Sequence, residues 1–459
     1  MTHRSTLETN HTWQWQLKRR QFLKMASTAA ASGMGLGTLA HLGAAAQSAT
    51  DYKALVCLFM FGGNDGNNMV VPLDNAPYNQ YRALRTNLAL GQAALLPIAP
   101  TNTGGATYGL HPGMAGMQGL FTQGRAAVIA NVGPLAVPTT KAQWNARSVP
   151  LPDNLFSHSD QQAQWQSAIV DAPPRNGWGG RMMERLLAAD AVNRGYGVLS
   201  VAGGNVWETG EVNLAAYKVS SSGNFGFNFY NPAGTDPLSV AISQTLGESR
   251  SHLLDKAWLE VMGRSIENQR VLTAALGATT LTTAFPATGL GRQLKMIARL
   301  IAARTQLGLP RQCFFCSIGG FDTHGDDQLQ RQNELLGEIS AAVAAFYAAT
   351  EELLMQNNVT LFTASDFGRT GQSNGQGSDH GWGSHHFVVG GAVKGNQMYG
   401  NFPTMVLGGP EEIGNGNWVP GTSVDQMGAT LGKWFGVGSA LNEVFPRLPN
   451  FNPDLGFMV

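Results

Sequence analysis

Four continuous apolar runs, each ending in a polar or glycine-rich turn, are the clearest pattern along the chain. They occupy Ala54–Phe61, Ala126–Val132, Gln312–Ile318 and Asn358–Ala364. An unbroken apolar run of this length predicts a strand that is buried on both faces of a sheet. Helical patterns lie between them, at residues 113–124, 181–190, 290–307 and 328–356. This alternation predicts an α/β fold with a doubly wound, mostly parallel sheet and helices on both faces.

One long segment departs from this alternation. Residues 198–244 are rich in glycine, asparagine, serine and aromatic residues, with only short alternating patches, and helical patterns follow from about residue 241 to residue 275. We interpret residues 198–280 as an insertion in the α/β domain that forms a lid or rim. The organisation predicted for the chain is thus an N-terminal leader, residues 1–46, and one α/β domain, residues 47–459, with this insertion.

The first 46 residues resemble a twin-arginine export signal. Lys18, Arg19 and Arg20 begin a basic stretch, a glycine-broken apolar run follows at residues 25–42, and small residues precede Gln47. An ordinary secretory signal or a membrane anchor would be the alternatives, but the apolar run is shorter than the ~20 residues of a spanning helix. The sequence predicts passage through the twin-arginine translocase, a periplasmic or secreted protein, and no stable membrane span in the mature chain.

The composition argues against some classes of function but identifies none. Lysine plus arginine equals aspartate plus glutamate at 30 each, so no excess charge points to a nucleic-acid partner. Cys313 and Cys316 have the spacing of a redox motif, but in a strand their thiols would point to opposite faces. With Cys57 as the third, the sequence predicts buried cysteines and no essential disulfide.

An aspartate follows three of the four predicted strands: Asp65, Asp322 and Asp366. In parallel sheets, ligands bind beyond the carboxyl ends of the strands. A single aspartate there is common in turns and at helix starts. Three of them at one edge favour a shared anionic pocket.

Histidines gather near these aspartates. Of the ten histidines, three fall in the leader region, and four of the remaining seven lie in FDTHGDD and GSDHGWGSHH. Carboxylate oxygens and neutral imidazoles bind zinc and harder divalent cations, and polar loops with capping aspartates are the alternative. We predict one or two divalent ions (Zn, Mn, Ca or Mg). The candidate ligands are Asp65, Asp322, His324, Asp366, Asp379 and His380.

Three more residues are candidates for the chemistry itself. Ser157 is a candidate nucleophile that a metal can activate, with His158 beside it. Alternatively, this stretch only begins a helix, with Ser159 as its cap and Gln162 placed as in a capping box. Arg369 suits bidentate capture of phosphate or sulfate oxygens, or it pairs with Asp366 or Asp379 and orients a ligand.

The ordered strings FGGNDGNN, LFSHSDQQ, FDTHG, SDFGRT, SDHGWGSHH and VKGNQMYG resemble the bacterial family called domain of unknown function 1501, a relative of the alkaline phosphatase and sulfatase superfamily. The resemblance implies an alkaline-phosphatase-like fold with a two-metal site. Asp65 would bridge to the first metal, Asp366 would bind that ion, and Asp322 and His324 would bind the second. Ser157 would be the nucleophile. Candidate substrate-binding residues are Asn67, His385 and His386.

The chain departs from the superfamily pattern at two points. Its second-metal motif, Asp322-Thr323-His324, is Asp-x-His where the superfamily has Asp-x-x-x-His. Phe367 follows Asp366 where the superfamily carries a histidine, and Asp379-His380 comes 13 residues after Asp366 as a candidate replacement. Two functions therefore stay open. One is an exported metal-dependent hydrolase of phosphate or sulfate esters, carried by small molecules or polymers. The other is a non-catalytic metal-binding protein of the periplasm or cell surface that kept the fold.

Overall fold

The structure is a computed structural model that describes residues 51–187, 194–212, 214–223 and 230–459. Residues 52–459 form one compact unit. The predicted export signal, residues 1–46, lies outside the described residues. Among the described helices, none combines the length and the apolar composition that a membrane crossing requires.

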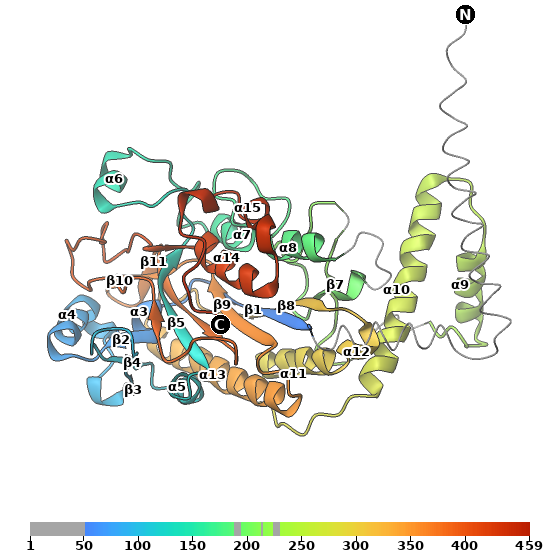
Figure 1. The fold of residues 1–459 in the computed structure, drawn as a ribbon, viewed down its shortest axis with the longest axis horizontal. Helices are drawn as coiled ribbons and strands as arrows, with labels where there is room; N and C mark the ends of the chain where they lie inside the picture. The colour runs from blue at the N-terminus through green and yellow to red at the C-terminus, as the bar shows by residue number, and fades with distance from the viewer. Residues whose placement is uncertain (1–50, 188–193, 213, 224–229) are drawn as a thin grey trace, which may run out of the picture. The chain divides into compact units, whose positions relative to one another are not determined.

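A nine-stranded sheet forms the centre of the unit (Figure 1). All of its strand pairs are parallel except those made by β12, which runs antiparallel to both of its neighbours. The four apolar runs of the sequence are β1, β5, β8 and β9, so the predicted α/β class with a mostly parallel sheet is confirmed. The strand order is β13 (Met398–Tyr399), β5 (Ala126–Gly133), β12 (Ser384–Val389), β9 (Val359–Ser365), β1 (Lys53–Phe61), β8 (Arg311–Gly319), β6 (Val198–Ser200) and β7 (Tyr217–Lys218), and β14 (Thr422–Ser423) pairs with β5.

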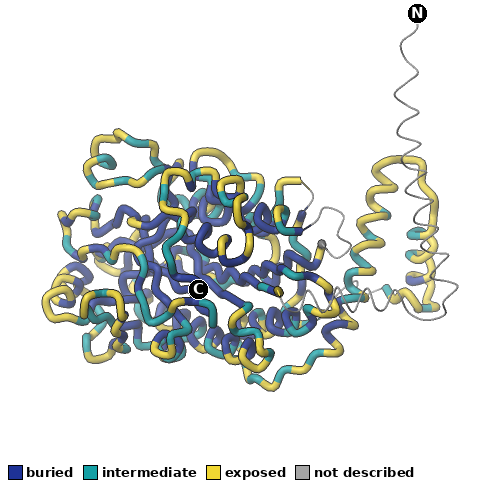
Figure 2. Tube along the Cα trace, in the orientation of Figure 1, coloured by how far each residue is buried: buried dark blue, intermediate teal, exposed yellow. Residues whose placement is uncertain are grey.

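Helices cover both faces of this sheet (Figure 1). One layer holds α5 (Ala115–Thr122), α11 (Gly289–Ala302) and α13 (Gln328–Glu352), and the opposite layer holds α7 (His158–Ser167), α8 (Trp178–Leu186), α14 (Val424–Phe435) and α15 (Leu441–Val444). The strands between the layers are buried along nearly their whole length (Figure 2). The core therefore lies on both sides of the sheet, as continuous apolar strands require.

Smaller elements surround the edge where β1, β8 and β9 end. The short helix α3 (Gly66–Met69) follows β1, and α4 (Asn75–Arg85) packs beside a ribbon of β10 (Arg369–Ser373) and β11 (Ser378–His380). The other elements of the described chain with at least four residues, or in sheets, are β2 (Val70–Pro72), β3 (Leu96–Ile98), β4 (Tyr108–Leu110), α6 (Lys141–Ala146), α9 (Pro237–Gly247), α10 (Leu253–Gly277) and α12 (Arg304–Leu307).

The segment interpreted as an insertion begins inside the sheet. Its first strand, β6, pairs parallel with β8, and β7 pairs with β6, so both extend the sheet beyond the predicted strands. These strands have three and two residues, too short for a periodic pattern to be visible in the sequence. The helices expected between residues 241 and 275 are α9 and α10.

A buried carboxyl group lies against the cysteine-bearing strands. Cys57, Cys313 and Cys316 are buried on β1 and β8, and burial raises the pKa of each thiol. Burial also raises the pKa of Glu208 to about 8, although the Asn205 side-chain amide donates a hydrogen bond of 2.6 Å to it. The Glu208 carboxyl group is consequently protonated in the folded chain at neutral pH.

We predict that Glu208 makes the folded state less stable as the pH rises. Its pKa in the folded state lies above the ordinary value. Its contribution to the free energy of unfolding is therefore fully present below about pH 4.5 and is lost as the pH rises through about 8. In urea unfolding, the free energy of unfolding of the wild type relative to that of Glu208→Gln should therefore fall over this window, by up to about 1.4 kcal/mol per pH unit. The same comparison with Glu334→Gln, on the exposed face of α13, should show no such fall. Identical pH dependence of the wild type and Glu208→Gln would contradict the prediction.

Candidate functional site

Three parallel strands bring the predicted aspartates to one edge of the sheet. β1 pairs with β8 as far as Phe61 opposite Gly319, and with β9 as far as Met60 opposite Ser365. Asp65, Asp322 and Asp366 follow the ends of these strands. The shared edge is thus a direct result of the parallel pairing.

A cluster of ligand atoms lies at this edge. His158, Asp322 and His380 each offer one such atom, and these atoms lie within 4.8 Å of one another. His158 Nε2 is 3.5 Å from Asp322 Oδ2, and His380 Nε2 is 3.4 Å from Asp322 Oδ1. His324 joins them, because its Nε2 lies 3.0 Å from both Asp322 Oδ1 and His380 Nε2. We call these four residues the histidine cluster.

Each imidazole of the histidine cluster is oriented through its other nitrogen. His158 Nδ1 lies 2.7 Å from Asp366 Oδ2, and His324 Nδ1 lies 3.2 Å from Asp379 Oδ1. His380 Nδ1 lies 2.8 Å from the carbonyl oxygen of Phe156, which can only accept a hydrogen bond. In a neutral imidazole that donates from Nδ1, the lone pair is on Nε2, the atom that each ring directs toward the cluster. This is how proteins prepare histidines to bind a metal.

The groups that hold these imidazoles are themselves fixed. Asp366 is fully buried, and its Oδ2 also accepts a 2.8 Å hydrogen bond from the side chain of Gln162. Its Oδ1 has no hydrogen-bond partner in the described chain. Phe156 has a positive φ of 72°, which is unusual for a bulky residue and aims its carbonyl at His380. Rigid support of this kind is typical of functional sites.

Arg369 fastens Asp322 to the surrounding backbone. Its buried guanidinium donates to Asp322 Oδ1 at 2.6 Å and lies 3.2 Å from His324 Nε2. Its other donors go to main-chain oxygens of the turns at the edge, namely those of Gly62, Gly63, Phe321 and Ser378. Of the two roles considered from the sequence, the structure places Arg369 in an ion pair, but with Asp322 rather than with Asp366 or Asp379.

The pKa values of three residues at this site are shifted from their ordinary values. Burial raises the pKa of Asp322, but the hydrogen bond and charge of Arg369 outweigh it and leave the pKa below its ordinary value. The hydrogen bond from Asn374 likewise lowers the pKa of Asp379. Burial lowers the pKa of His380. The site therefore presents charged carboxylates together with a neutral imidazole at His380, which is the protonation state that binds metal.

Ser157 is the N-cap residue of α7, and this corrects the helix start considered from the sequence. Ser159 is not the cap, and Gln162 reaches Asp366 instead of closing a capping box. The Ser157 hydroxyl donates to Asp160 Oδ2 at 2.5 Å and lies 3.3 Å from Ser159 Oγ. The Ser157 side chain thus bonds to side chains of the first turn of α7 and not to its backbone, while its neighbour His158 belongs to the histidine cluster.

Asp65 lies in a buried ion pair apart from the histidine cluster. Arg85, at the end of α4, donates to Asp65 Oδ2, and the side chain of Gln328 donates to the same oxygen at 2.7 Å. Asn67 is also committed to protein contacts, since it donates to the Arg369 carbonyl at 2.8 Å and accepts from Trp418 at 2.8 Å. Both residues hold the turn after β1 against the β10–β11 ribbon.

The paired histidines His385 and His386 are buried on β12. His385 Nδ1 accepts a hydrogen bond of 3.1 Å from the Asn131 backbone, and its ring stacks on Phe402. His386 lies 3.3 Å from the Thr363 hydroxyl. Burial lowers the pKa of both histidines to about 3, so they are neutral residues of the core. The structure does not place them with the histidine cluster.

The structure thus unites only part of the predicted set. Asp322, His324 and His380 come together, Asp366 and Asp379 orient histidines, and Asp65 pairs with Arg85. Sequence reasoning considered His158 beside the nucleophile and did not place it among the ligands. The sequence contained one signal that His158 belongs to the site: His158 and Gln162 are four residues apart and so share a helix face. In the structure, both side chains contact Asp366.

Comparison with known proteins gives a family but no activity. A family model described as "Protein of unknown function (DUF1501)" matches residues 52–437. No curated protein matches the chain. Among solved structures, the crystal structure of the PsFucS1 sulfatase from Pseudoalteromonas sp. is similar with a TM-score of 0.33 and 9% sequence identity, over 91% of this chain and 74% of that chain.

The Asp65–Arg85 pair leads to a stability prediction. Both side chains are buried, so Arg85→Met leaves a buried carboxylate without its cation and should lower the free energy of unfolding by about 3 to 5 kcal/mol. Combining it with Asp65→Asn should recover most of the loss in urea unfolding experiments, because the uncompensated charge is gone. Asp65 lies apart from the histidine cluster, so Asp65→Asn alone should leave unchanged any binding of zinc by that cluster. A large loss of zinc affinity would instead identify Asp65 as a metal ligand.

Proposed function

The chain belongs to the DUF1501 family of proteins of unknown function, and we propose from its site that it is a metal-dependent hydrolase. The observation that carries this proposal is the approach of His324 Nε2 to His380 Nε2, at 3.0 Å, while both rings are held through Nδ1. A cation bound to both nitrogens would hold two unprotonated Nε2 atoms this close, whereas a proton on one of them would make the contact a hydrogen bond. Asp322 adds a carboxylate beside the same two atoms.

The chemistry of the histidine cluster fits one ion of the zinc type. Four ligands at the ~2.0–2.1 Å of zinc–nitrogen bonds in a tetrahedron lie about 3.3 Å apart. The separations of 3.0, 3.4 and 3.5 Å from His324, His380 and His158 to the Asp322 carboxylate are close to this value, and three residues, His158, Asp322 and His380, have ligand atoms within 4.8 Å of one another. Asp366 Oδ1, which is buried and has no hydrogen-bond partner in the described chain, fits this proposal as well. A carboxylate that orients a metal-bound histidine receives part of the metal's positive charge through the imidazole ring.

In the proposed site, the chain's own residues position and balance the metal centre. A divalent ion held there acts as a Lewis acid toward an ester oxygen and lowers the pKa of water. Asp366, Asp379 and the Phe156 carbonyl keep the Nε2 atoms directed inward. Arg369 offsets the charge of Asp322 and fixes its position, so that the ligands need no rearrangement.

The proposed substrates are phosphate or sulfate esters, the class that the sequence resemblance implies. We propose water rather than Ser157 as the nucleophile, since the Ser157 hydroxyl is already donated to Asp160. The proposed location is the periplasm or the exterior of the cell, which depends on the twin-arginine resemblance of Arg19 and Arg20. The substrate class, the nucleophile and the location can each be tested by a separate experiment.

A second candidate function is supported by a specific observation. Every donor nitrogen of Arg369 contacts protein acceptors, so its guanidinium offers no free fork to a phosphate or sulfate group. This favours a metal-binding protein of the periplasm or cell surface that performs no turnover. Metal binding is common to both functions, and hydrolysis distinguishes them.

We predict that the purified chain binds about one equivalent of zinc and that the histidine cluster holds it. His158→Ala and His380→Ala should each lower the zinc affinity, measured by competition with a chelator, by more than about 100-fold. Asp366→Ala should lower it about 10- to 100-fold, the usual effect of removing the partner that orients a metal-bound histidine.

The matched control for these variants is Ser159→Ala, an exposed change in the same turn of α7. It should keep the zinc affinity of the wild type. Less than about half an equivalent of metal in the wild type, after loading with zinc, manganese, calcium or magnesium, would rule out the proposed site. Equal affinities for Ser159→Ala and His158→Ala would place the metal elsewhere.

We also predict that the zinc-loaded chain hydrolyses an aryl phosphate or aryl sulfate and that His158→Ala abolishes this activity. Ser157→Ala should keep the rate within about tenfold of the wild type, because general acid–base or nucleophilic groups contribute more than that when they act directly. A complete loss of hydrolysis in Ser157→Ala, with metal retained, would identify Ser157 as the nucleophile. Full metal occupancy without hydrolysis of any ester tested would favour the non-catalytic function.

A further inference from the structure

Arg331 lies in the first turn of α13, beside the turn that carries Asp322. Its backbone nitrogen donates a 2.8 Å hydrogen bond to the Asp327 carbonyl, so the residue belongs to the helix. Gly320 has a φ of +102°, and a Cβ atom there would lie 2.5 Å from Arg331 Nη2 and 3.1 Å from its Nε. The guanidinium therefore packs directly against the backbone of Gly320, two residues before Asp322.

One edge of this guanidinium has no partner in the described chain. Nη1 of Arg331 donates a long hydrogen bond of 3.4 Å to Glu334 Oε2. This ion pair is exposed to solvent, so it restrains the side chain only weakly. Nε and Nη2 donate no hydrogen bond to any described residue. These two nitrogens are the parallel donors with which an arginine binds two oxygens of one phosphate or sulfate group.

The other two arginines at this edge of the sheet are committed to the protein. Arg85 is buried in its ion pair with Asp65 and also donates to main-chain oxygens. Arg369 uses its donors on Asp322 and on the surrounding backbone. An anionic ester requires positive charge at the site in addition to the metal ion. Of these three arginines in the described chain, Arg331 alone has a free pair of donors.

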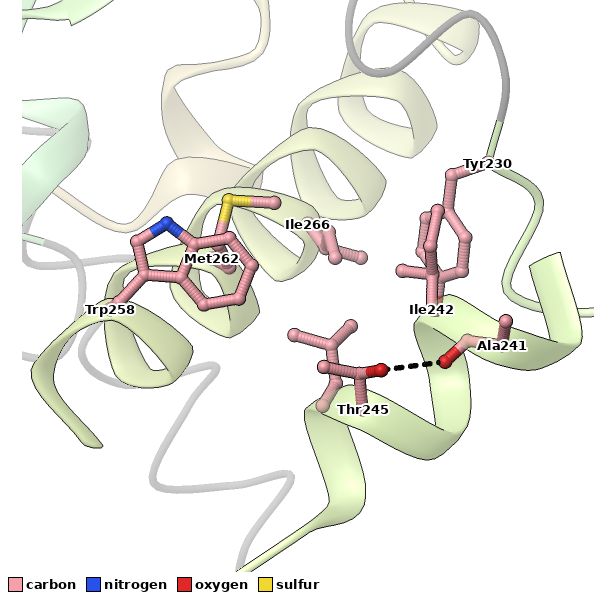
Figure 3. A pocket seen from close by; sticks show the side chains of 8 residues that line it. Tyr230, Ala241, Ile242, Thr245, Trp258, Met262 and Ile266 are labelled. Atoms are coloured by element: carbon pink, nitrogen blue, oxygen red, sulfur yellow. Dashed lines mark hydrogen bonds between the residues drawn. The ribbon is translucent and has the colours of Figure 1, made fainter. Parts of the chain in front are cut away.

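An apolar groove elsewhere in the chain offers no such donors. It has a volume of about 380 Å³ and lies between α9 and α10 (Figure 3). Its lining is almost wholly apolar, and the Thr245 hydroxyl donates to the Ala241 carbonyl at 2.9 Å. An anion in this groove would lose its hydration without gaining hydrogen bonds. The groove is therefore no alternative to the guanidinium as a site for an anionic group.

The backbone between Gly320 and Asp322 limits how far the guanidinium lies from the histidine cluster. A Cβ atom is about 1.5 Å from its Cα atom, so Arg331 Nη2 lies within about 4 Å of the Gly320 Cα atom. Two residues of fully extended chain span at most about 7 Å, so Nη2 is no more than about 11 Å from the Asp322 Cα atom. A phosphate or sulfate group beside Asp322, with charge-assisted hydrogen bonds of about 2.8 Å, fills part of this span.

We propose that Arg331 binds the phosphate or sulfate group of the substrate through Nε and Nη2, next to the histidine cluster. The proposal rests on the proposed hydrolase function and deepens it, because it names the residue that selects anionic esters. A phosphate group offers three acceptor oxygens, so two can accept from the guanidinium while the third faces the histidine cluster. Glu334 keeps its contact with Nη1, so binding of the anion breaks no hydrogen bond of the chain.

Titration calorimetry of the zinc-loaded full chain with inorganic phosphate, and separately with sulfate, tests the proposal without turnover. Arg331→Gln should raise the dissociation constant of each anion by about 10- to 100-fold, because it removes a charge-assisted pair of hydrogen bonds. Arg331→Lys should raise it less, since a lysine keeps the charge but has no planar fork. Both variants should retain the zinc content of the wild type.

Arg270→Gln is the matched control for these variants. Arg270 forms an exposed ion pair with Glu267, three residues away on α10, and so resembles Arg331 in its local contacts. The control should bind phosphate and sulfate like the wild type. In the hydrolysis assay, Arg331→Gln should raise KM for an aryl phosphate by about 10- to 100-fold and change kcat less, because the anion is bound before and during the reaction.

The possible results distinguish the role of Arg331 from hydrolysis itself. Equal phosphate affinity in the wild type and Arg331→Gln, or no phosphate binding by the wild type, overturns the role of Arg331. Hydrolysis with an unchanged KM in Arg331→Gln also overturns it but leaves the hydrolase function standing. A chain that binds phosphate through Arg331 and cleaves no ester supports the role of Arg331 and overturns the hydrolase function.

Discussion

The arrangement of the site depends on the guanidinium of Arg369. This buried side chain bonds to main-chain oxygens of the turn after β1, the turn after β8 and the strand β11, and it also holds Asp322. These segments are far apart in the sequence and meet only at the carboxyl edge of the sheet. A guanidinium has five donors in a fixed plane, so it can join several backbone segments where a lysine could not. Arg369 therefore fixes the framework on which the histidine cluster is built.

Close approach of the backbone makes this framework possible. Gly62 has a φ of +114°, and a Cβ atom there would lie 2.4 Å from the Asp322 backbone nitrogen. Gly63 has a φ of +84°, and its Cβ atom would lie 2.4 Å from the Phe367 ring. Only glycine accepts both the positive φ and the lack of space. The glycine pair after β1 thus brings its carbonyl oxygens to Arg369 and seats Asp322 beside them.

The sequence predicted the sheet better than it predicted the partners of its charged residues. Long apolar runs are visible without tertiary information, and so β1, β5, β8 and β9 were found with the aspartates at their ends. Pairing is a different matter, because it depends on which side chains meet after folding. Asp65 pairs with Arg85 of α4, and nothing in the intervening residues distinguishes that arginine from others. His385 and His386 resembled polar ligands, but they occupy the antiparallel strand β12, whose burial depends on its neighbours β5 and β9.

Phe367 and Asp366 lie on two sides of the imidazoles at this edge of the sheet. The β10–β11 ribbon places His380 opposite Arg369 and so brings an imidazole beside Phe367. The centroid of the Phe367 ring lies 4.5 Å from that of His380 and 4.8 Å from that of His158. Among the buried aspartates of this edge, Asp65 has Arg85 as its cation, whereas the hydrogen bonds of Asp366 in the described chain come from His158 and Gln162. A buried carboxylate without a cation is costly. In the proposed site, a metal ion bound at His158 Nε2 would supply positive charge to Asp366 through the imidazole.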